Sequence, residues 1–514
     1  MMKILNTIKY TFLGIMLILT GCTKFLDVDV PDNLVKDKFW QNREQVYSSL
    51  IGLYTSLNSC VRNFQVWGDI RSSLYAPGLS NNFTNSYAQF LGHDIYTTNG
   101  LLPWENQYKA IGWVNAFIKN APAALQNDAT FKEAELKNMI GEAYAIRALV
   151  YFYLVRSFKE VPILKEPYES DSQTFNTAPS SENEVLDFIE EDLVLALKDA
   201  PEAFSDTRER YGRVTKNAVR AIMADVKLWR NDYAACIDIC KTLDASYANT
   251  LVRPQDWYTI FYPGNSPESI FELQYSLQGP SSPLYNWFAA GDGITAIYLG
   301  NQANIKINAG DVLYPSTMPD LHFSADTIRL KNYSSFTTAP TFDNGYTSSS
   351  YEVYKFLGQA PYQRAYRRQN DRTANYIFYR YREILFMKAE AYGMLGQYDE
   401  AEKVINIIRE HCDLPALAPG EGGEGVEFFT RLLMEREFEL GFEGKEWFAA
   451  VRVSRRPGYN DILIEKAAVN NSMRLAYQVV RARLLNTESW FLPYPRTEVE
   501  NNPLLQQKDY YKNK

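Results

Sequence analysis

The sequence predicts an all-α protein in which tetratricopeptide-like helix pairs form a scaffold for long irregular insertions rich in aromatic residues. Apolar residues recur at helical spacing in two blocks, at about 33–245 and 376–514. Two short segments repeat the pattern of a helix pair joined by a tight turn. Between the blocks, residues 250–375 show little helical periodicity and are rich in Asn, Ser, Thr, Gly, Pro and aromatic residues.

The N-terminus has the pattern of a secretory signal. Two lysines precede an apolar run over residues 12–19, which ends in small residues directly before Cys22. The run is shorter than the roughly 20 residues that a membrane-spanning helix needs. The cysteine makes the segment resemble a bacterial lipoprotein signal, in which Cys22 becomes the lipidated first residue. We therefore expect residues 1–21 to be a cleaved signal and residues 22–514 to form a single domain.

Three helices are predicted in the first block. Apolar residues follow a helical period from Leu136 to Phe158, and Pro162 stops that helix. A similar period runs from Trp104 to Ala121, and we expect these two helices to form a pair. A third helix is predicted over Glu182–Ala200, with Ser181 in position to cap its N-terminus.

Two segments, 224–235 and 389–401, echo each other. Each has small residues on a first helix, a polar turn, a tyrosine (Tyr233 or Tyr398) and small residues that open a second helix. Small residues let antiparallel helices approach closely, and the tyrosine fills the gap at the turn. This pattern is typical of a tetratricopeptide helix pair, and several such pairs can stack into one superhelix.

Charge and cysteine content restrict the partners. The formal net charge of −8 does not suit nucleic acid or anionic lipid and favours a neutral partner. Beyond Cys22, four cysteines are too few for a disulfide framework in 514 residues. Cys236 and Cys240 are four apart, which could suit metal ligands, but no histidine lies nearby and two buried thiols are the favoured interpretation. We expect no metal and no cofactor.

Several motifs together resemble the SusD/RagB family of outer-membrane nutrient-binding lipoproteins. The similarity runs over essentially the full mature length, and two positions depart from the pattern: Lys159, where glycine is usual, and Ala449, where aspartate is common. The motifs that carry it are Phe25-Leu26-Asp27, Phe39-Trp40, Gly141-Glu142-Ala143, Arg147-Ala148, Tyr151-Phe152, Val161-Pro162, Gly212-Arg213, Thr215-Lys216, Glu435-Arg436, Glu439-Leu440, Phe442-Glu443-Gly444, Trp447-Phe448, Arg452, Pro493, Pro495 and Asn502-Pro503.

This resemblance implies a function. Such a protein is anchored by lipid to the outer membrane, is exposed at the cell surface, and binds a glycan or oligosaccharide, or a peptide in some branches. It delivers that nutrient to a SusC-like TonB-dependent transporter and is not an enzyme. The implied fold is helical, with the irregular insertions forming the ligand face.

Charged residues in these motifs are assigned to the scaffold. We expect ion pairs involving Glu142 with Arg147, and Glu435 and Glu439 with Arg436, to fix the register of the helices. Exposed pairs contribute only about 0–1 kcal/mol, whereas breaking a buried pair costs more.

The ligand residues are predicted from what a sugar requires. A sugar ring has an apolar C–H face and a rim of hydroxyls, so its site needs flat aromatic rings beside polar side chains. Such residues gather in two irregular regions, around 68–100 and 280–300. The predicted ligand residues are Trp67, Tyr75, Asn81, Asn82 and Tyr87 in the first region, and Tyr285, Trp287, Tyr298 and the hydroxyl acceptor Asp292 in the second.

Other functions remain open at this point. A secreted all-α glycoside hydrolase needs two carboxylates about 5–9.5 Å apart, and 61 acidic residues do not exclude such a pair. However, none of the three histidines falls in a metal or nucleophile motif, and no Gly-x-Ser-x-Gly or His-Glu-x-x-His sequence occurs. A peptide-binding member of the same family and a pure protein-interaction scaffold are further alternatives.

Overall fold

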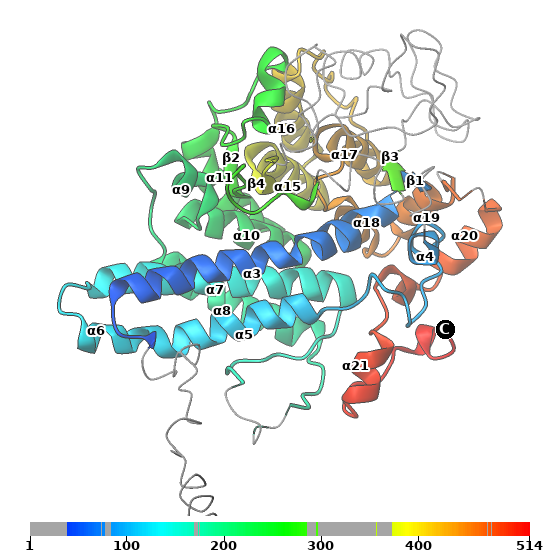
Figure 1. Ribbon diagram of the computed structural model, residues 1–514. Helices are drawn as coiled ribbons and strands as arrows, with labels where there is room; N and C mark the ends of the chain where they lie inside the picture. The colour runs from blue at the N-terminus through cyan, green and yellow to red at the C-terminus, as the bar shows by residue number, and fades with distance from the viewer. Residues whose placement is uncertain are drawn as a thin grey trace, which may run out of the picture.

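Helices dominate the structure, and the predicted all-α class is confirmed (Figure 1). The computed structural model describes residues 39–72, 74–77, 84–168, 173, 175–284, 294–296, 356, 373–469, 471–473 and 475–514. The predicted signal and Cys22 lie outside these residues. No helix in the described part of the chain is both long enough and apolar enough to span a membrane.

Four long helices from the first block lie side by side (Figure 1). They are α3 (Arg43–Asp69), α5 (Glu105–Asn120), α7 (Glu133–Phe158) and α8 (Glu182–Asp199). α7 is the central one, because every side chain from Ala145 onward is buried. It packs against the other three, so the predicted pairing of the helices around 104–121 and 136–158 is confirmed.

The ends of these helices have local causes. Ser181 caps α8, and its side chain and that of Glu184 each accept a hydrogen bond from the other residue's backbone, which forms a capping box. The main chain leaves α7 at Lys159, whose φ of 68° lies in the left-handed region. The helix therefore ends at Phe158, four residues before Pro162.

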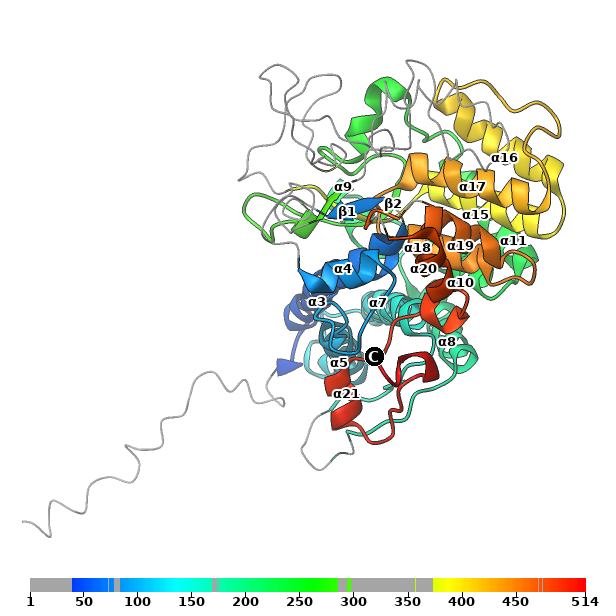
Figure 2. The ribbon, with the colours of Figure 1, turned by 90° about the vertical axis from the view of Figure 1, so that its right-hand side faces the viewer.

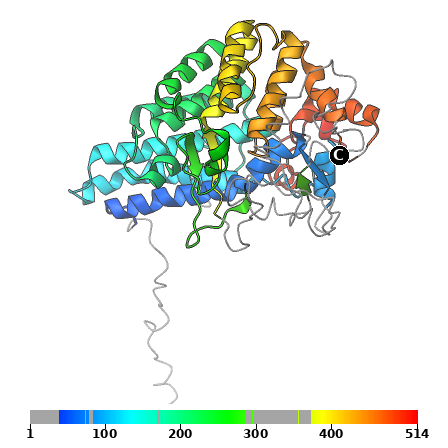
Figure 3. The same ribbon diagram turned by 90° about the horizontal axis from the view of Figure 1, so that it is seen from above.

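Both predicted helix pairs are present. α10 (Lys216–Trp229) turns into α11 (Tyr233–Tyr247), and α15 (Tyr381–Met394) turns into α16 (Tyr398–His411). α11 also packs against α15, so the two pairs stack on each other. Seen from above, the pairs follow one another across the molecule (Figure 3).

The C-terminal helices return toward the first block. α17 (Gly425–Leu440) packs against α15, and α18 (Glu446–Ser454) packs against α3, so the two predicted blocks are also in contact here. Figure 2 shows α21 and the C-terminus on the side of the molecule that carries α5. The helices of this part are α17 (Gly425–Leu440), α18 (Glu446–Ser454), α19 (Asn460–Val469), α20 (Tyr477–Leu484) and α21 (Arg496–Asn501).

The remaining helical elements are short. They connect the long helices or close the ends of the chain. They are η2 (Ile70–Ser72), α4 (Asn85–Leu91), η3 (Ala121–Ala123), α6 (Ala124–Asn127), α9 (Thr207–Gly212), η4 (Pro254–Ile260), η7 (Thr487–Trp490) and η8 (Asp509–Tyr511).

In the described part of the chain, four short strands form two antiparallel ladders that the helical prediction did not contain. β1 (Tyr75–Pro77) pairs with β3 (Ile294–Ala296), and β2 (Ser269–Leu273) pairs with β4 (Tyr376–Arg380). In the second ladder Ser269 lies opposite Arg380, and all ten residues are buried. Both ladders lie in or beside the segments expected to be irregular.

One cluster of buried apolar side chains runs from Val46 to Leu505 and includes residues from both helical blocks. The four cysteines beyond Cys22 are buried in the protein and form no disulfide: Cys60, Cys236, Cys240 and Cys412. The described residues contain no cluster of His, Cys, Asp and Glu that could hold a metal ion.

Candidate ligand-binding face

The ladder of β1 and β3 joins the two regions in which ligand residues were predicted. Tyr75 lies opposite Ala296, and Pro77 lies opposite Ile294. Because the strands are antiparallel, the last residue of β1, Pro77, and the first residue of β3, Ile294, lie at the same end of the ladder. Strands more than 200 positions apart in the sequence are thereby brought together, and we call the end of the ladder at Pro77 and Ile294 the ladder face.

Tyr75 is held inside the protein beneath this ladder. Its hydroxyl donates to Asp69 Oδ2 at 2.6 Å and accepts from Gln65 Nε2 at 2.9 Å. Its ring packs edge-on against Phe442, with 5.3 Å between centroids, and the residue is 1% exposed. The tyrosine therefore ties β1 to the end of α3, and its ring offers no open face to a solute.

Trp67 and Tyr87 are also buried. The indole of Trp67 is 1% exposed, donates its N–H to the carbonyl of Leu101 at 2.9 Å and packs edge-on against Phe158. Tyr87 is 3% exposed, and its hydroxyl accepts from Arg62 Nη2 at 3.2 Å. Both rings belong to the core of the protein. The other predicted ligand residues lie outside the described residues: Asn81, Asn82, Tyr285, Trp287, Asp292 and Tyr298.

A close backbone contact fixes the end of α3 below β1. A Cβ atom on Gly68 would lie 1.9 Å from the carbonyl oxygen of Gly444, so only glycine fits there. The turn between α17 and α18 reaches this contact through left-handed residues, Phe442 with φ 70° and Gly444 with φ 83°. Residues of the family motif around 442–444 thus determine how closely the two helical blocks meet.

The ladder of β2 and β4 ties together the two ends of residues 274–375, which we call the insertion. Glu272 contributes directly, because its carboxylate accepts from Asn375 Nδ2 at 2.9 Å and from Gln274 Nε2 at 3.2 Å. It also accepts from the backbone N–H of Asn265 at 2.7 Å and from Ser269 Oγ at 3.1 Å. All four donors are uncharged, and burial raises the pKa of Glu272.

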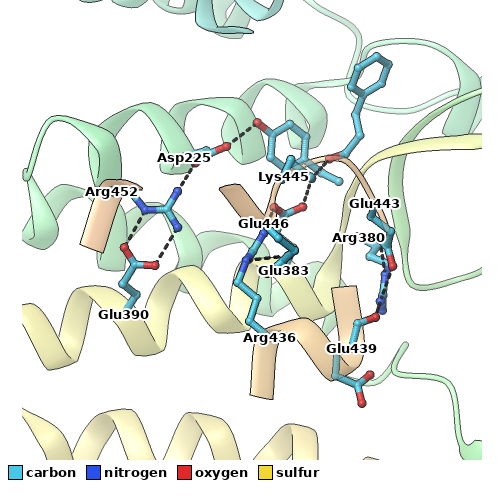
Figure 4. A network of polar contacts seen from close by, with 12 residues as sticks. Asp225, Arg380, Glu383, Glu390, Arg436, Glu439, Glu443, Lys445, Glu446 and Arg452 are labelled. Carbon is cyan, nitrogen blue, oxygen red and sulfur yellow. Dashed lines mark hydrogen bonds and ion pairs between the residues drawn. The ribbon is translucent and has the colours of Figure 1, made fainter. Parts of the chain in front are cut away.

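Buried ion pairs surround this second ladder (Figure 4). At the end of β4, Arg380 contacts Glu268 at 2.6 Å and Glu443 at 2.9 Å, and its neighbour Arg382 contacts Glu439 at 3.2 Å. Burial alone would lower the pKa of Arg380, but Glu443 and Glu268 raise it above its ordinary value. The β2–β4 ladder is therefore joined to α17 and the α17–α18 turn by buried ion pairs.

A second buried cluster lies between α15, α17 and α18. Lys445 pairs with Glu383 and donates to the carbonyl of Phe378, while Arg436 contacts Glu383 at 3.1 Å and Glu446 at 3.2 Å (Figure 4). Burial lowers the pKa of Lys445, and Glu383 opposes that shift. Each charge has a partner on another element, which suits a structural role.

A third cluster joins the stacked helix pairs. Arg452 makes a two-pronged contact with Glu390, each bond 2.7 Å long, and also reaches Asp225 at 3.1 Å (Figure 4). Asp225 further contacts Arg156 at 3.0 Å and accepts from the hydroxyl of Tyr379. The scaffold role predicted for the charged motif residues agrees with these contacts.

The predicted pairing within the motifs is wrong in its partners. Glu142 pairs with Arg213 at 2.5 Å, and Arg147 pairs with Asp192 at 2.8 Å instead of with each other. Arg436 likewise turns away from the acids of its own helix, toward Glu383 and Glu446. Each buried charge has an ionic partner far away in the sequence, because an unpaired buried charge is costly.

The fold and its ladders define a tetratricopeptide-like helical protein with an insertion tethered at two points. Solved structures share this architecture. A SusD-like protein from Bacteroides fragilis NCTC 9343 superposes with a TM-score of 0.70 at 21% identity, covering 92% of this chain and 98% of that one. A structure named as a laminarin-binding SusD-like protein has a TM-score of 0.64 at 21% identity, covering 91% and 99%. At these identities the likeness establishes the fold.

Sequence comparison identifies the family. The model of the SusD family matches residues 312–511, and a model described as starch-binding associating with outer membrane matches residues 24–228. The SusD-like proteins P38 and P2 of Formosa agariphila are 25% and 26% identical to this chain. The alignments cover 88% and 87% of this chain, and 93% and 90% of those relatives. The chain belongs to the SusD family.

Proposed function

We propose that this chain is a lipid-anchored outer-membrane protein that binds a glycan and delivers it to a SusC-like TonB-dependent transporter, with no chemistry of its own. The observation that carries the proposal is membership of the SusD family, supported in both helical blocks. A structural neighbour named as laminarin-binding supports a glycan as the ligand. In this proposal Cys22 carries the lipid.

The pairing of β1 with β3 supports one shared site for the two predicted regions. The chain continues from Pro77 toward Asn81 and Asn82, and it arrives at Ile294 from the segment with Tyr285, Trp287 and Asp292. Tyr298 follows two residues after β3 ends. Aromatic faces would stack on the sugar, and amide and carboxylate groups would bind its hydroxyls. The proposed contact residues are Asn81, Asn82, Tyr285, Trp287, Asp292 and Tyr298. Trp67, Tyr75 and Tyr87 support that face from within the core.

A binding screen on residues 23–514 tests the proposal. Isothermal titration against neutral oligosaccharides, including laminarin fragments, is expected to find at least one ligand. Replacing Trp287 by alanine should weaken that ligand by about tenfold or more, because a stacked aromatic contributes more than 1 kcal/mol. Trp113→Ala is the matched control, since Trp113 is 64% exposed on α5 and should leave affinity unchanged.

The same samples separate the alternatives. Release of reducing sugar during incubation would identify a glycoside hydrolase and refute a purely binding role. Affinity for peptides with none for glycans would identify a peptide-binding member of the family. If the protein bound neither glycans nor peptides but still bound a protein partner, it would be identified as an interaction scaffold.

Anchoring and delivery need a cellular experiment. Cys22→Ser should move the protein from the outer-membrane fraction to the soluble fraction, because lipid chains hold such a protein without a spanning helix. The wild-type protein should co-purify with a TonB-dependent transporter from detergent-solubilised membranes. Recovery of the Cys22→Ser protein in the membrane fraction would contradict the proposed anchor.

A further inference from the structure

A cavity of about 680 Å³ lies between α8 and the connection that leads to it from α7. Its size falls within the range of about 300–1,000 Å³ that is typical of small-molecule sites. In Figures 1 and 2 this connection and the two ladders lie on opposite sides of α3 and α7. The cavity is therefore separate from the ladder face, and we call it the α8 cavity.

Aromatic rings form its base and rim. Phe188 of α8 lines the base and is 6% exposed. Tyr168 lines the rim and is 41% exposed, and its ring packs against that of Phe175, with 4.9 Å between centroids. An exposed aromatic ring beside a cavity offers a flat face to the C–H side of a sugar.

The polar lining is strongly unbalanced in charge. Four carboxylates line the α8 cavity, three of them from one face of α8 at Glu184, Asp187 and Glu191, and one from Glu166. Lys165 is the single ammonium in the described lining. A site of this kind disfavours anions and gains from a cation that neutralises the carboxylates.

The carboxylates differ in how they are already engaged. Glu184 is engaged in the capping box with Ser181, and Asp187 pairs with Arg230 at 2.6 Å. Glu166 contacts Lys119 at 3.5 Å. Among the described residues no cation pairs with Glu191, which leaves this carboxylate available at the cavity wall.

The protein itself shows that an ammonium fits here. Lys165 Nζ lies 5.1 Å from the centroid of the Phe188 ring, within the distance of a cation–π contact. It forms no ion pair within the described part of the chain. A ligand ammonium entering beside it would meet the carboxylate of Glu191.

We propose that the α8 cavity is a second ligand site that binds an amino sugar, with the ring on Tyr168 and the ammonium at Glu191. A free amine is required, because acetylation removes the charge that would pair with Glu191. The choice of a sugar over a lysine-bearing peptide rests on the proposed function. The site itself rests only on the cavity, its exposed aromatics and its charge.

The test uses isothermal titration of residues 23–514 at low ionic strength. The probes are a glucosamine hexamer, its fully N-acetylated counterpart and a lysine-containing peptide. The free-amine hexamer is expected to bind at least about tenfold more tightly than the acetylated one, because only it gains the ionic contact. Added salt should weaken the free-amine complex, since exposed charges are screened.

Variants locate the site. Glu191→Gln should weaken the free-amine hexamer about fivefold, and Tyr168→Ala about tenfold. Lys165→Met should strengthen it, because a competing ammonium leaves the cavity. Glu44→Gln is the control for net charge, since Glu44 is an exposed carboxylate on α3 that does not line the cavity and should change nothing.

Equal affinity for the free and acetylated hexamers would overturn the proposal. So would unchanged affinity in both Glu191→Gln and Tyr168→Ala. Binding of the peptide alone would overturn the assignment to a sugar. If Trp287→Ala abolished binding of the amino sugar, the amino sugar would bind at the ladder face and the second site would be overturned. If Trp287→Ala still bound the amino sugar, the α8 cavity would be supported, even if the ladder face binds no glycan.

Discussion

The two strand ladders hold the same insertion in different ways. The ladder of β2 and β4 has five buried residues on each strand. Arg380 is the last residue of β4, and its guanidinium pairs with two buried glutamates. The ladder of β1 and β3 has three residues on each strand and is supported through the hydroxyl of Tyr75. We infer that the first ladder sets the stability of the scaffold, whereas the second sets the geometry of the ladder face.

Breaking the ionic support of β4 should have the largest effect. Arg380→Met leaves Glu268 and Glu443 buried without this partner, and the expected loss is about 3–5 kcal/mol in the free energy of unfolding. Chemical denaturation followed by circular dichroism measures it. Arg43→Met is the control, because its pair with Glu135 is partly exposed and should contribute less than about 1 kcal/mol. Similar losses in both variants would contradict a special role for the β2–β4 ladder.

The contact under β1 should have the next largest effect. Gly68→Ala places a methyl group against the carbonyl of Gly444, and the backbone shift should cost about 1–3 kcal/mol. Gly52→Ala in the same helix meets nothing within 4 Å and should stabilise the protein by roughly 0.5–1 kcal/mol. Thermal unfolding measures both variants, and their midpoints should shift in opposite directions from that of the wild type. A stabilising Gly68→Ala would refute the close approach of α3 to the α17–α18 turn.

Removing the hydroxyl of Tyr75 should have a smaller effect on stability. Tyr75→Phe loses a hydrogen bond to Asp69 and one from Gln65, and should cost about 0.5–1.5 kcal/mol. If the β1–β3 ladder sets the geometry of the ladder face, the free energy of glycan binding should weaken by more than the free energy of unfolding does. Tyr477→Phe removes an exposed hydroxyl contact with Glu465 and should change stability by less than about 0.5 kcal/mol.

The smallest expected effect is a pH dependence at Glu272. Burial raises the pKa of Glu272 in the folded state above its ordinary 4.5, so the folded protein binds this proton more tightly than the unfolded chain does. Its contribution to stability is therefore largest at low pH and falls as pH rises from about 4.5 through the folded pKa. As pH rises across that window, the wild type should lose stability relative to Glu272→Gln, and the difference between the two free energies of unfolding should then level off. A difference that moves the other way, or not at all, would contradict the raised pKa.

The helical part of the fold could be predicted because its signals are local. The period over 136–158 corresponds to α7, Ser181 caps α8, and both small-residue repeats became helix pairs. Each of these features depends on residues within a few turns of one another. The three-residue strands of the β1–β3 ladder carry almost no local signal, because their stability comes from a pairing across more than 200 positions.

Long-range packing also explains what the sequence did not reveal about the site. Trp67 stands near an aromatic-rich segment, but it continues the buried face of α3 that contains Leu57, Cys60 and Phe64. That period could have indicated a core position. The partner of Glu142 could not have been found in this way, because Arg213 lies 71 positions away on another element. The ligand residues of the insertion remain predictions.

The burial of the cysteines has a practical consequence for observing this protein in motion. Burial raises the pKa of the Cys60 thiol, and the other three described thiols are equally shielded from reagents. A chain that starts at residue 23 therefore presents no readily modified sulfur to a maleimide dye. A Trp113→Cys substitution would give a fluorophore one defined attachment point, from which movements of the protein could be followed in real time.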